Sequence, residues 1–174
     1  MGSFYENATL VGPPRGQWFP VATHKFIVLS ICSFGIYDFY WVYQNWRRAQ
    51  LATGEAISPF WRTFLVVPIY VFPLLRRMRR SAVAAGVPAR WNPDLLAVLF
   101  VALAFAPLLP NIGFFLSLIS CTPLIPVVRT IAAVNAAAGN PEGVNDQYTL
   151  PCVVAIAFGA FICLLVIVAT ILGY

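Results

Sequence analysis

The fold of this chain depends on the stretch KFIVLSICSFGIYDFYWVYQNWRR, residues 25–48. Between residues 26 and 46 its one ionisable acid or base is Asp38, and about 20 predominantly apolar residues are what a transmembrane helix needs. Aromatic side chains crowd the second half of this run, directly before Arg47 and Arg48. Aromatic rings gather at membrane interfaces, and arginines mark the cytoplasmic side. The stretch therefore predicts a first transmembrane helix over residues 26–46.

The composition extends this prediction to the whole chain. Of its 174 residues, 60% are hydrophobic and only 10% are charged, against about 25% charged in an average soluble domain. We expect a single membrane domain over residues 1–174, with a polar N-terminal segment at residues 1–24. Three further apolar runs predict transmembrane helices at residues 95–109, 112–128 and 152–173.

One further helix, at about residues 59–80, is predicted not to cross. Its uncharged part, Thr63 to Leu75, covers only about 20 Å, and it contains Pro68 and Pro73. If it turns back, nine Lys and Arg residues lie inside and two outside; if it crosses, the division is eight to three. The charges alone barely separate the two topologies, so helix length and the prolines decide. The predicted fold is an all-α integral membrane protein of four transmembrane helices plus one Pro-interrupted re-entrant or interfacial helix, with both termini outside.

An arginine-rich cytoplasmic face is the first candidate site. Arg62, Arg76, Arg77, Arg79 and Arg80 gather around the predicted re-entrant helix. Each arginine near a membrane surface contributes about 1 kcal/mol to attraction of anionic head groups. The pattern predicts a site for anionic lipid, and the alternative is that these charges serve only to orient the protein.

A polar stripe on the first span is the second candidate. Asp38, Asn45 and Arg48 follow one another at helical spacings, and an acid within hydrocarbon needs a partner. We interpret them as intramembrane polar residues. Asp38 is either a proton or cation site, an anchor for a re-entrant arginine, or a carboxylate near the interface that is hydrated or paired with Arg62, Arg76 or Arg129.

Small residues recur every four positions in the last span, at Ala155, Gly159 and Cys163. Such a stripe lets another helix approach closely. The approaching helix is either internal or part of a second copy.

The sequence contains none of the common motifs of catalytic or metal-binding sites. There is no Gly-rich phosphate loop, no HExxH and no Gly-x-Ser-x-Gly, and the chain has one histidine and four cysteines without metal-site spacing. We therefore predict no catalytic residues, no metal and no cofactor. Nucleic acid is not an expected partner, because the arginines follow the predicted membrane boundary.

A resemblance is carried by Gly35-Ile36-Tyr37, Tyr40-Trp41, Tyr43 and Asn45-Trp46. This pattern resembles the first span of the DUF4234-like proteins, a group of small bacterial integral membrane proteins. The resemblance implies a multi-pass location in the bacterial inner, or cytoplasmic, membrane, and it implies no activity or site residues.

The function predicted from these observations is non-enzymatic. We expect the arginine-rich face to bind anionic lipid head groups or a partner membrane protein, with a homo-oligomer as a further form of assembly. One alternative is a small transporter or channel subunit that uses Asp38 and the Pro-broken helices. A second alternative is a lipid-modifying membrane enzyme.

Overall fold

The computed structural model describes residues 18–54, 59, 63, 67–109, 116, 118–139 and 145–172. Within these residues every regular element is a helix. The elements are α2 (Thr23–Cys32), α3 (Ile36–Thr53), α5 (Val67–Ala84), α6 (Pro93–Ala104), α8 (Ile125–Ala137) and α9 (Leu150–Leu172), with short 3₁₀ turns η1 (Ala106–Leu108) and η2 (Thr122–Leu124).

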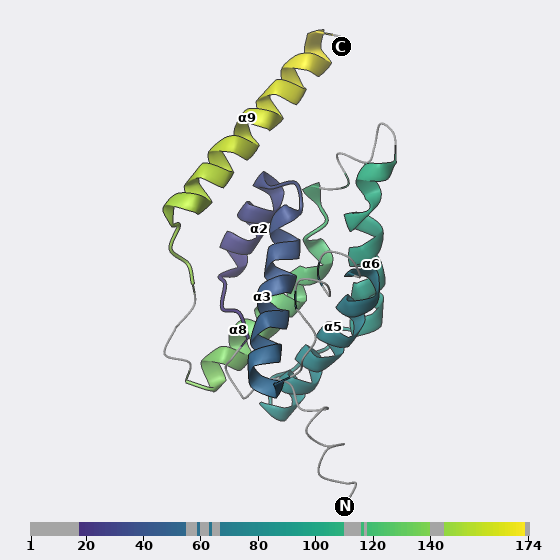
Figure 1. Cartoon of the computed structure of the whole chain (residues 1–174), viewed down its shortest axis with the longest axis vertical. Coiled ribbons are helices and arrows are strands. Elements are labelled where there is room, and N and C mark those ends of the chain that lie inside the picture. Colours follow the sequence, from purple (N-terminus) through teal and green to yellow (C-terminus); the bar gives the residue numbers. More distant parts are fainter. Residues whose placement is uncertain are drawn as a thin grey trace, which may run out of the picture.

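The stretch that was predicted to be one span is a helical hairpin. After Cys32 the backbone turns at Phe34 and Gly35, which have φ angles of 52° and 84°. α3 then runs back beside α2, as Figure 1 shows. The hairpin is closed by Ser30, whose hydroxyl donates a 2.5 Å hydrogen bond to Asp38 eight residues later. The prediction of one continuous helix over residues 26–46 is wrong, because two successive residues with positive φ interrupt the apolar run.

The other helices pack around this hairpin. α5 contacts α3, α6 and α8, and α8 also contacts α2. α6 starts at Pro93, where the side chain of Asn92 accepts hydrogen bonds from the backbone N–H groups of Asp94 and Leu95. α8 ends at Ala137, and Gly139 follows with a φ of 65°. Asn92 and Gly139 are residue types that commonly cap the start and the end of a helix, respectively.

Between the helices lies a core rich in aromatic residues. Trp18, Phe26, Trp41 and Phe100 have no exposed surface, and the rings of Phe26 and Trp41 meet edge-on with centroids 5.6 Å apart. Leucine, methionine and valine side chains from α5 and α8 complete it.

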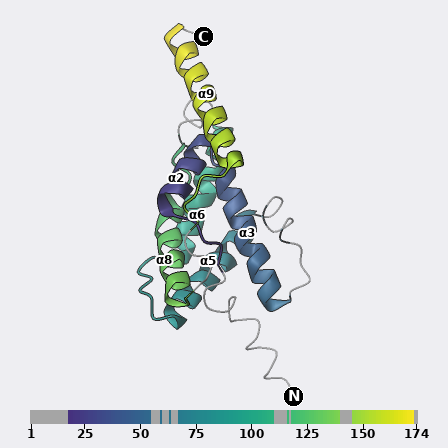
Figure 2. The same ribbon diagram turned by 90° about the vertical axis from the view of Figure 1, so that its left-hand side faces the viewer.

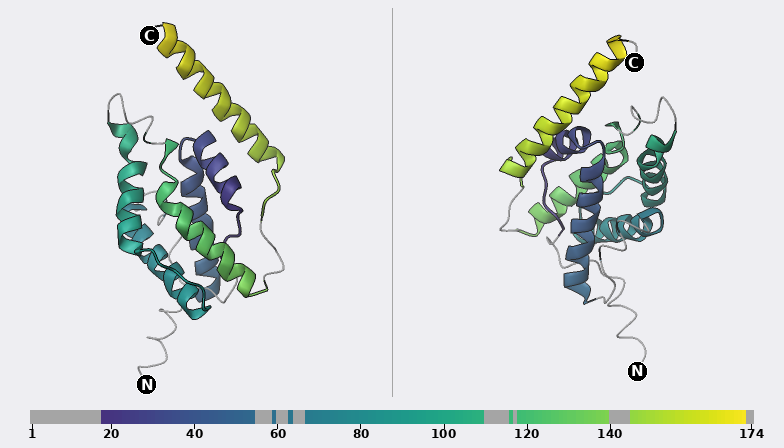
Figure 3. Two further views of the ribbon diagram at one scale, coloured as in Figure 1. Left: turned by 180° about the vertical axis from the view of Figure 1, so that it is seen from behind. Right: turned by 45° about the horizontal axis from the view of Figure 1, so that its top comes forward.

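α9 lies outside this core and contacts α2. Its C-terminal half extends beyond the other helices in both Figure 1 and Figure 2, and the two further views in Figure 3 show the same arrangement. Several of its large apolar side chains are exposed, among them Val154, Phe158 and Phe161.

Among the residues that the structure describes, no helix has both the length and the apolar composition that crossing a membrane requires. This finding contradicts the predicted integral membrane fold, its four transmembrane helices and its re-entrant helix. It also contradicts the predicted multi-pass location in the bacterial inner membrane.

The short lengths of α2, α6 and α8 and the charged residues of α3 and α5 explain why these five helices are not transmembrane helices. α2, α6 and α8 have 10, 12 and 13 residues, which at about 1.5 Å per residue cover about 15–20 Å of a hydrocarbon core of about 30 Å. α3 and α5 have 18 residues each, but α3 carries Asp38, Arg47 and Arg48, and α5 carries four arginines. The predicted span at residues 112–128 contains η2 and only the start of α8 in its described part, and residues 112–115 and 117 lie outside the described residues.

The segment predicted to be re-entrant becomes the ordinary helix α5. It does not stop at Arg80 but continues to Ala84, and Pro73 is inside it. Val71, Leu74 and Met78 are fully buried on its inner face. The start of the predicted segment, near residue 59, falls largely outside the described residues.

Candidate functional site

Three of the predicted arginines share the outer face of α5. Arg76, Arg79 and Arg80 are exposed, and their spacing of three and four residues places them on neighbouring turns of one helical face. The opposite face of α5 is buried in the core, so these charges cannot turn inward. The helix therefore places three arginine side chains on one surface.

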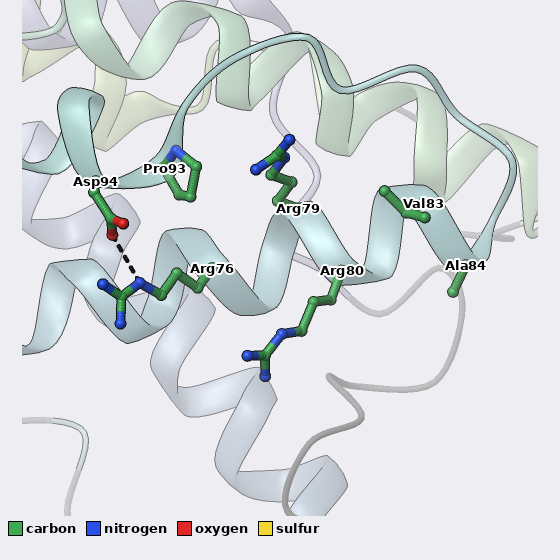
Figure 4. A pocket seen from close by; sticks show the side chains of 7 residues that line it. All are labelled: Arg76, Arg79, Arg80, Val83, Ala84, Pro93 and Asp94. Atoms are coloured by element: carbon green, nitrogen blue, oxygen red, sulfur yellow. Dashed lines mark hydrogen bonds and ion pairs between the residues drawn. The ribbon is translucent and has the colours of Figure 1, made fainter.

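These arginines line a cavity of about 540 Å³ between α5 and the start of α6. Small-molecule sites typically have volumes of about 300–1,000 Å³. Figure 4 shows the side chains around it, with Arg76 directed toward Asp94 and Arg79 and Arg80 diverging from the helix. The remaining wall is apolar and is formed by Val83, Ala84 and Pro93.

Asp94 neutralises one of the three charges. Nε of Arg76 donates a hydrogen bond of 2.7 Å to Oδ1 of Asp94, and both side chains are about half exposed. The hydrogen bond and the charge of Asp94 raise the pKa of Arg76 above its usual value. Asp94 is placed by the cap of α6, since its backbone N–H donates to Oδ1 of Asn92 at 2.9 Å.

Arg79 and Arg80 have no carboxylate partner among the residues that the structure describes. Three guanidinium groups and one carboxylate leave the cavity with a net charge of +2. Arginine offers a planar set of donors that matches a carboxylate or phosphate. The cavity is thus suited to an anion with an apolar part.

The structure does not bring the whole predicted arginine cluster together. Arg77 lies over the ring of Trp46, with its guanidinium carbon 5.4 Å from the ring centroid, on the side of α5 that faces α3. Arg62 lies outside the described residues.

Asp38 is remote from the cavity and fully buried. The hydroxyls of Ser30 and Ser120 donate to its two carboxylate oxygens at 2.5 Å and 2.8 Å. Burial raises the pKa of Asp38 to about 6, although the two serine hydrogen bonds act in the opposite direction. The carboxyl joins α2, α3 and the segment before η2, and none of the cavity-lining residues belongs to these elements.

Asn45 and Arg48 do not continue from Asp38 as a polar path. Asn45 accepts a hydrogen bond of 3.1 Å from the backbone N–H of Phe19, and Arg48 donates to the backbone oxygen of Trp18 at 3.4 Å. The guanidinium of Arg48 also lies over the Phe19 ring, 5.6 Å from its centroid. Both residues hold the segment that precedes α2.

Ala155, Gly159 and Cys163 lie on the face of α9 toward α2. Gly159 is buried, whereas Ala155 and Cys163 are half-buried. A Cβ atom on Gly159 would overlap the backbone of Cys32, so the two helices approach at that glycine. In this structure the stripe contacts a helix of the same chain.

Two residues with structural roles were missed in the sequence. Trp18 donates from its ring N–H to Ser81 at 3.0 Å and accepts from Asn135 at 3.0 Å through its backbone oxygen. Lys25 is almost fully buried and donates to the side chain of Asn145 at 2.7 Å. A tryptophan inside a polar segment was the available signal for Trp18, whereas nothing local marks Lys25.

In the described part of the chain, no three His, Cys, Asp or Glu residues are grouped as metal ligands. No family model matches the sequence, and neither the curated proteins nor the solved structures contain a match. The resemblance to DUF4234-like proteins therefore stays a prediction.

Proposed function

We propose that this chain is a non-enzymatic binding protein and that the cavity between α5 and α6 holds a phosphate-bearing anion. The observation that carries the proposal is that Arg76, Arg79 and Arg80 all line one cavity, whose lining side chains have a net charge of +2. A phosphate monoester carries between one and two negative charges near neutral pH, so its charge suits this site.

The shape of the cavity adds a second requirement. A cavity of about 540 Å³ is far larger than an inorganic phosphate, and its wall at Val83, Ala84 and Pro93 is apolar. The ligand therefore combines a phosphate with an organic part. An anionic lipid head group and a soluble phosphate ester share this chemistry.

No general acid or base is available to make this site an enzyme within the described residues. The one carboxylate that lines the cavity, Asp94, is paired with Arg76. Asp38 is enclosed elsewhere between serine hydroxyls. Binding without catalysis is the function that this arrangement favours.

The test uses glycerol 3-phosphate as a soluble probe and vesicles of equal parts phosphatidylglycerol and phosphatidylcholine as a lipid probe. Calorimetry measures the first, and co-sedimentation measures the second. We expect Arg79→Gln combined with Arg80→Gln to weaken binding at least tenfold, because two charge-assisted hydrogen bonds are lost. The matched control is Arg47→Gln combined with Arg129→Gln, which removes the same charge from exposed positions away from the cavity.

The outcomes are distinct. Binding of the soluble probe identifies a phosphate ester site, whereas binding of vesicles alone identifies a head-group site. If the wild-type chain binds neither probe, or if the control pair weakens binding as much as the cavity pair, the proposal is wrong.

A further inference from the structure

α2 and α9 approach each other closely beside a cysteine. A Cβ atom built on Gly159 would stand 2.8 Å from the Cα of Cys32, well inside contact distance. Cys32 is the last residue of α2, and it follows that α9 crosses the C-terminal end of α2 backbone against backbone.

A second cysteine lies one helical turn further along the same face. Cys163 follows Gly159 by four residues, which is about 6 Å along α9 and on the same side of the helix. Both cysteines are half-buried, and both thiols are free. The paired residues of a disulfide usually have Cα atoms 4.4–6.8 Å apart, and Cys163 is one helical turn from the glycine that lies against Cys32.

The electrostatics of Cys32 agree with this placement. Burial raises the pKa of the Cys32 thiol, and the neighbouring thiol of Cys163 raises it further. The two sulfur atoms are therefore close enough to influence each other.

The other two cysteines are placed differently. Cys152 lies about two turns before Gly159, and its sulfur is 3.3 Å from the hydroxyl of Thr149. Burial raises the pKa of the Cys121 thiol, and the charge of Asp38 raises it further. These positions make Cys121 and Cys152 internal controls.

We propose that Cys32 and Cys163 form a reversible disulfide that fastens α9 to α2, with a low-molecular-weight disulfide such as oxidised glutathione as the oxidant. One protein thiolate attacks a sulfur of glutathione disulfide, which forms a mixed disulfide and releases one glutathione. The second protein thiolate attacks the protein sulfur of the mixed disulfide and releases the other glutathione. Two protein thiols are oxidised, one glutathione disulfide is reduced to two thiols, and the two thiol protons end on the glutathione released.

The experiment treats the full chain with oxidised glutathione at pH 8 and maps its peptides without reduction. We expect one peptide pair joined through Cys32 and Cys163, which dithiothreitol separates. Cys32→Ser and Cys163→Ser should each abolish the link, whereas Cys121→Ser and Cys152→Ser should retain it. Fastening α9 should also raise the Tm by several degrees in a manner reversed by dithiothreitol, because the bond closes a long loop.

Three results would overturn the proposal. They are two separately glutathionylated cysteines, a link from Cys32 to a cysteine other than Cys163, and a link that forms only between two chains. The inference does not depend on the anion site, since Arg79→Gln with Arg80→Gln should leave this disulfide unchanged.

Discussion

The sequence predicts that Asp38 needs a partner, but it does not predict which residues are its partners. The sequence marks it as an acid in an apolar run that must have a partner. Its partners are two serine hydroxyls, from Ser30 and Ser120, and the second is 82 residues away. Because its pKa is raised to about 6, the folded protein holds a proton there more tightly than the unfolded chain does.

This buried carboxyl gives the stability of the protein a specific dependence on pH. A pKa raised from 3.8 to about 6 favours the fold below pH 4, and this contribution is lost as the pH rises to about 6. The loss amounts to about 3 kcal/mol. In Asp38→Asn it should be absent, so that the variant becomes more stable relative to the wild type between pH 4 and pH 7. Urea unfolding of both proteins at several pH values measures this difference, and parallel pH profiles would contradict the assignment.

Asp94 reduces the positive charge that the cavity offers to an anion. Its ion pair with Arg76 removes one of three positive charges from the proposed phosphate site. We expect Asp94→Asn to raise the affinity for glycerol 3-phosphate, because Arg76 then becomes available to the ligand. Asp146→Asn, at an exposed position among residues that do not line the cavity, provides the matched control in the same calorimetric titration. Equal gains in the two variants would show a general effect of charge and no local competition.

At the scale of elements, α2 and α3 form a hairpin where the sequence predicted a single transmembrane helix. Apolar content alone does not distinguish a membrane span from a tight hairpin whose inner faces pack in a core. Gly35 was a visible break, but the positive φ of Phe34 was not, since phenylalanine rarely adopts it. The caps of α6 at Asn92 and of α8 near Gly139 were predictable because each depends on a few neighbouring residues.

The candidate site also has one part that the sequence predicts and another part that depends on how the helices pack. The helical spacing of Arg76, Arg79 and Arg80 places them on one face, and the sequence is sufficient to show this. That Arg77 turns toward Trp46 and that Asp94 reaches Arg76 depend on how α3 and α6 pack against α5. No local pattern contains that information.

The contact of α9 with α2 is tested at Gly159. A methyl group there would overlap the backbone of Cys32, which cannot move as a flexible side chain does. We expect Gly159→Ala to displace α9 and to lower the free energy of unfolding by about 1–3 kcal/mol. Hydrogen exchange of the α9 amides should quicken. Ala157→Val adds volume on the exposed face of the same helix and should leave exchange unchanged; unaltered exchange in Gly159→Ala would argue against the close approach.

For the whole molecule, Trp18 joins more elements than any pattern in the sequence suggests. It bonds Ser81 of α5 and Asn135 of α8, and its backbone oxygen also accepts from Arg48 of α3. Its side chain has no exposed surface. The segment before α2 is therefore part of the core of the protein.

Removing this side chain should destabilise the entire structure. We expect Trp18→Ala to lower the free energy of unfolding by about 3–5 kcal/mol, because a large buried ring is lost and Ser81 loses its partner. Trp18→Phe retains most of the volume without the N–H group and should cost less. Chemical denaturation of both variants measures the two effects, and a loss for Trp18→Ala no greater than that for the half-exposed Tyr148→Ala would contradict this role.

The long reach of Trp18 and Lys25 has a consequence for synthesis of the protein. Their partners Asn135 and Asn145 lie 117 and 120 residues further along the chain. At about 5–20 residues per second, the ribosome needs about 6–24 s to add that much polypeptide. The α2 and α3 hairpin needs only residues 23–53, with Ser30 and Asp38 eight positions apart, and it can close in the meantime. The segment at Trp18 reaches its final position only after Asn135 and Asn145 have been synthesised, and until then the nascent chain exposes the apolar surface that Trp18 later covers.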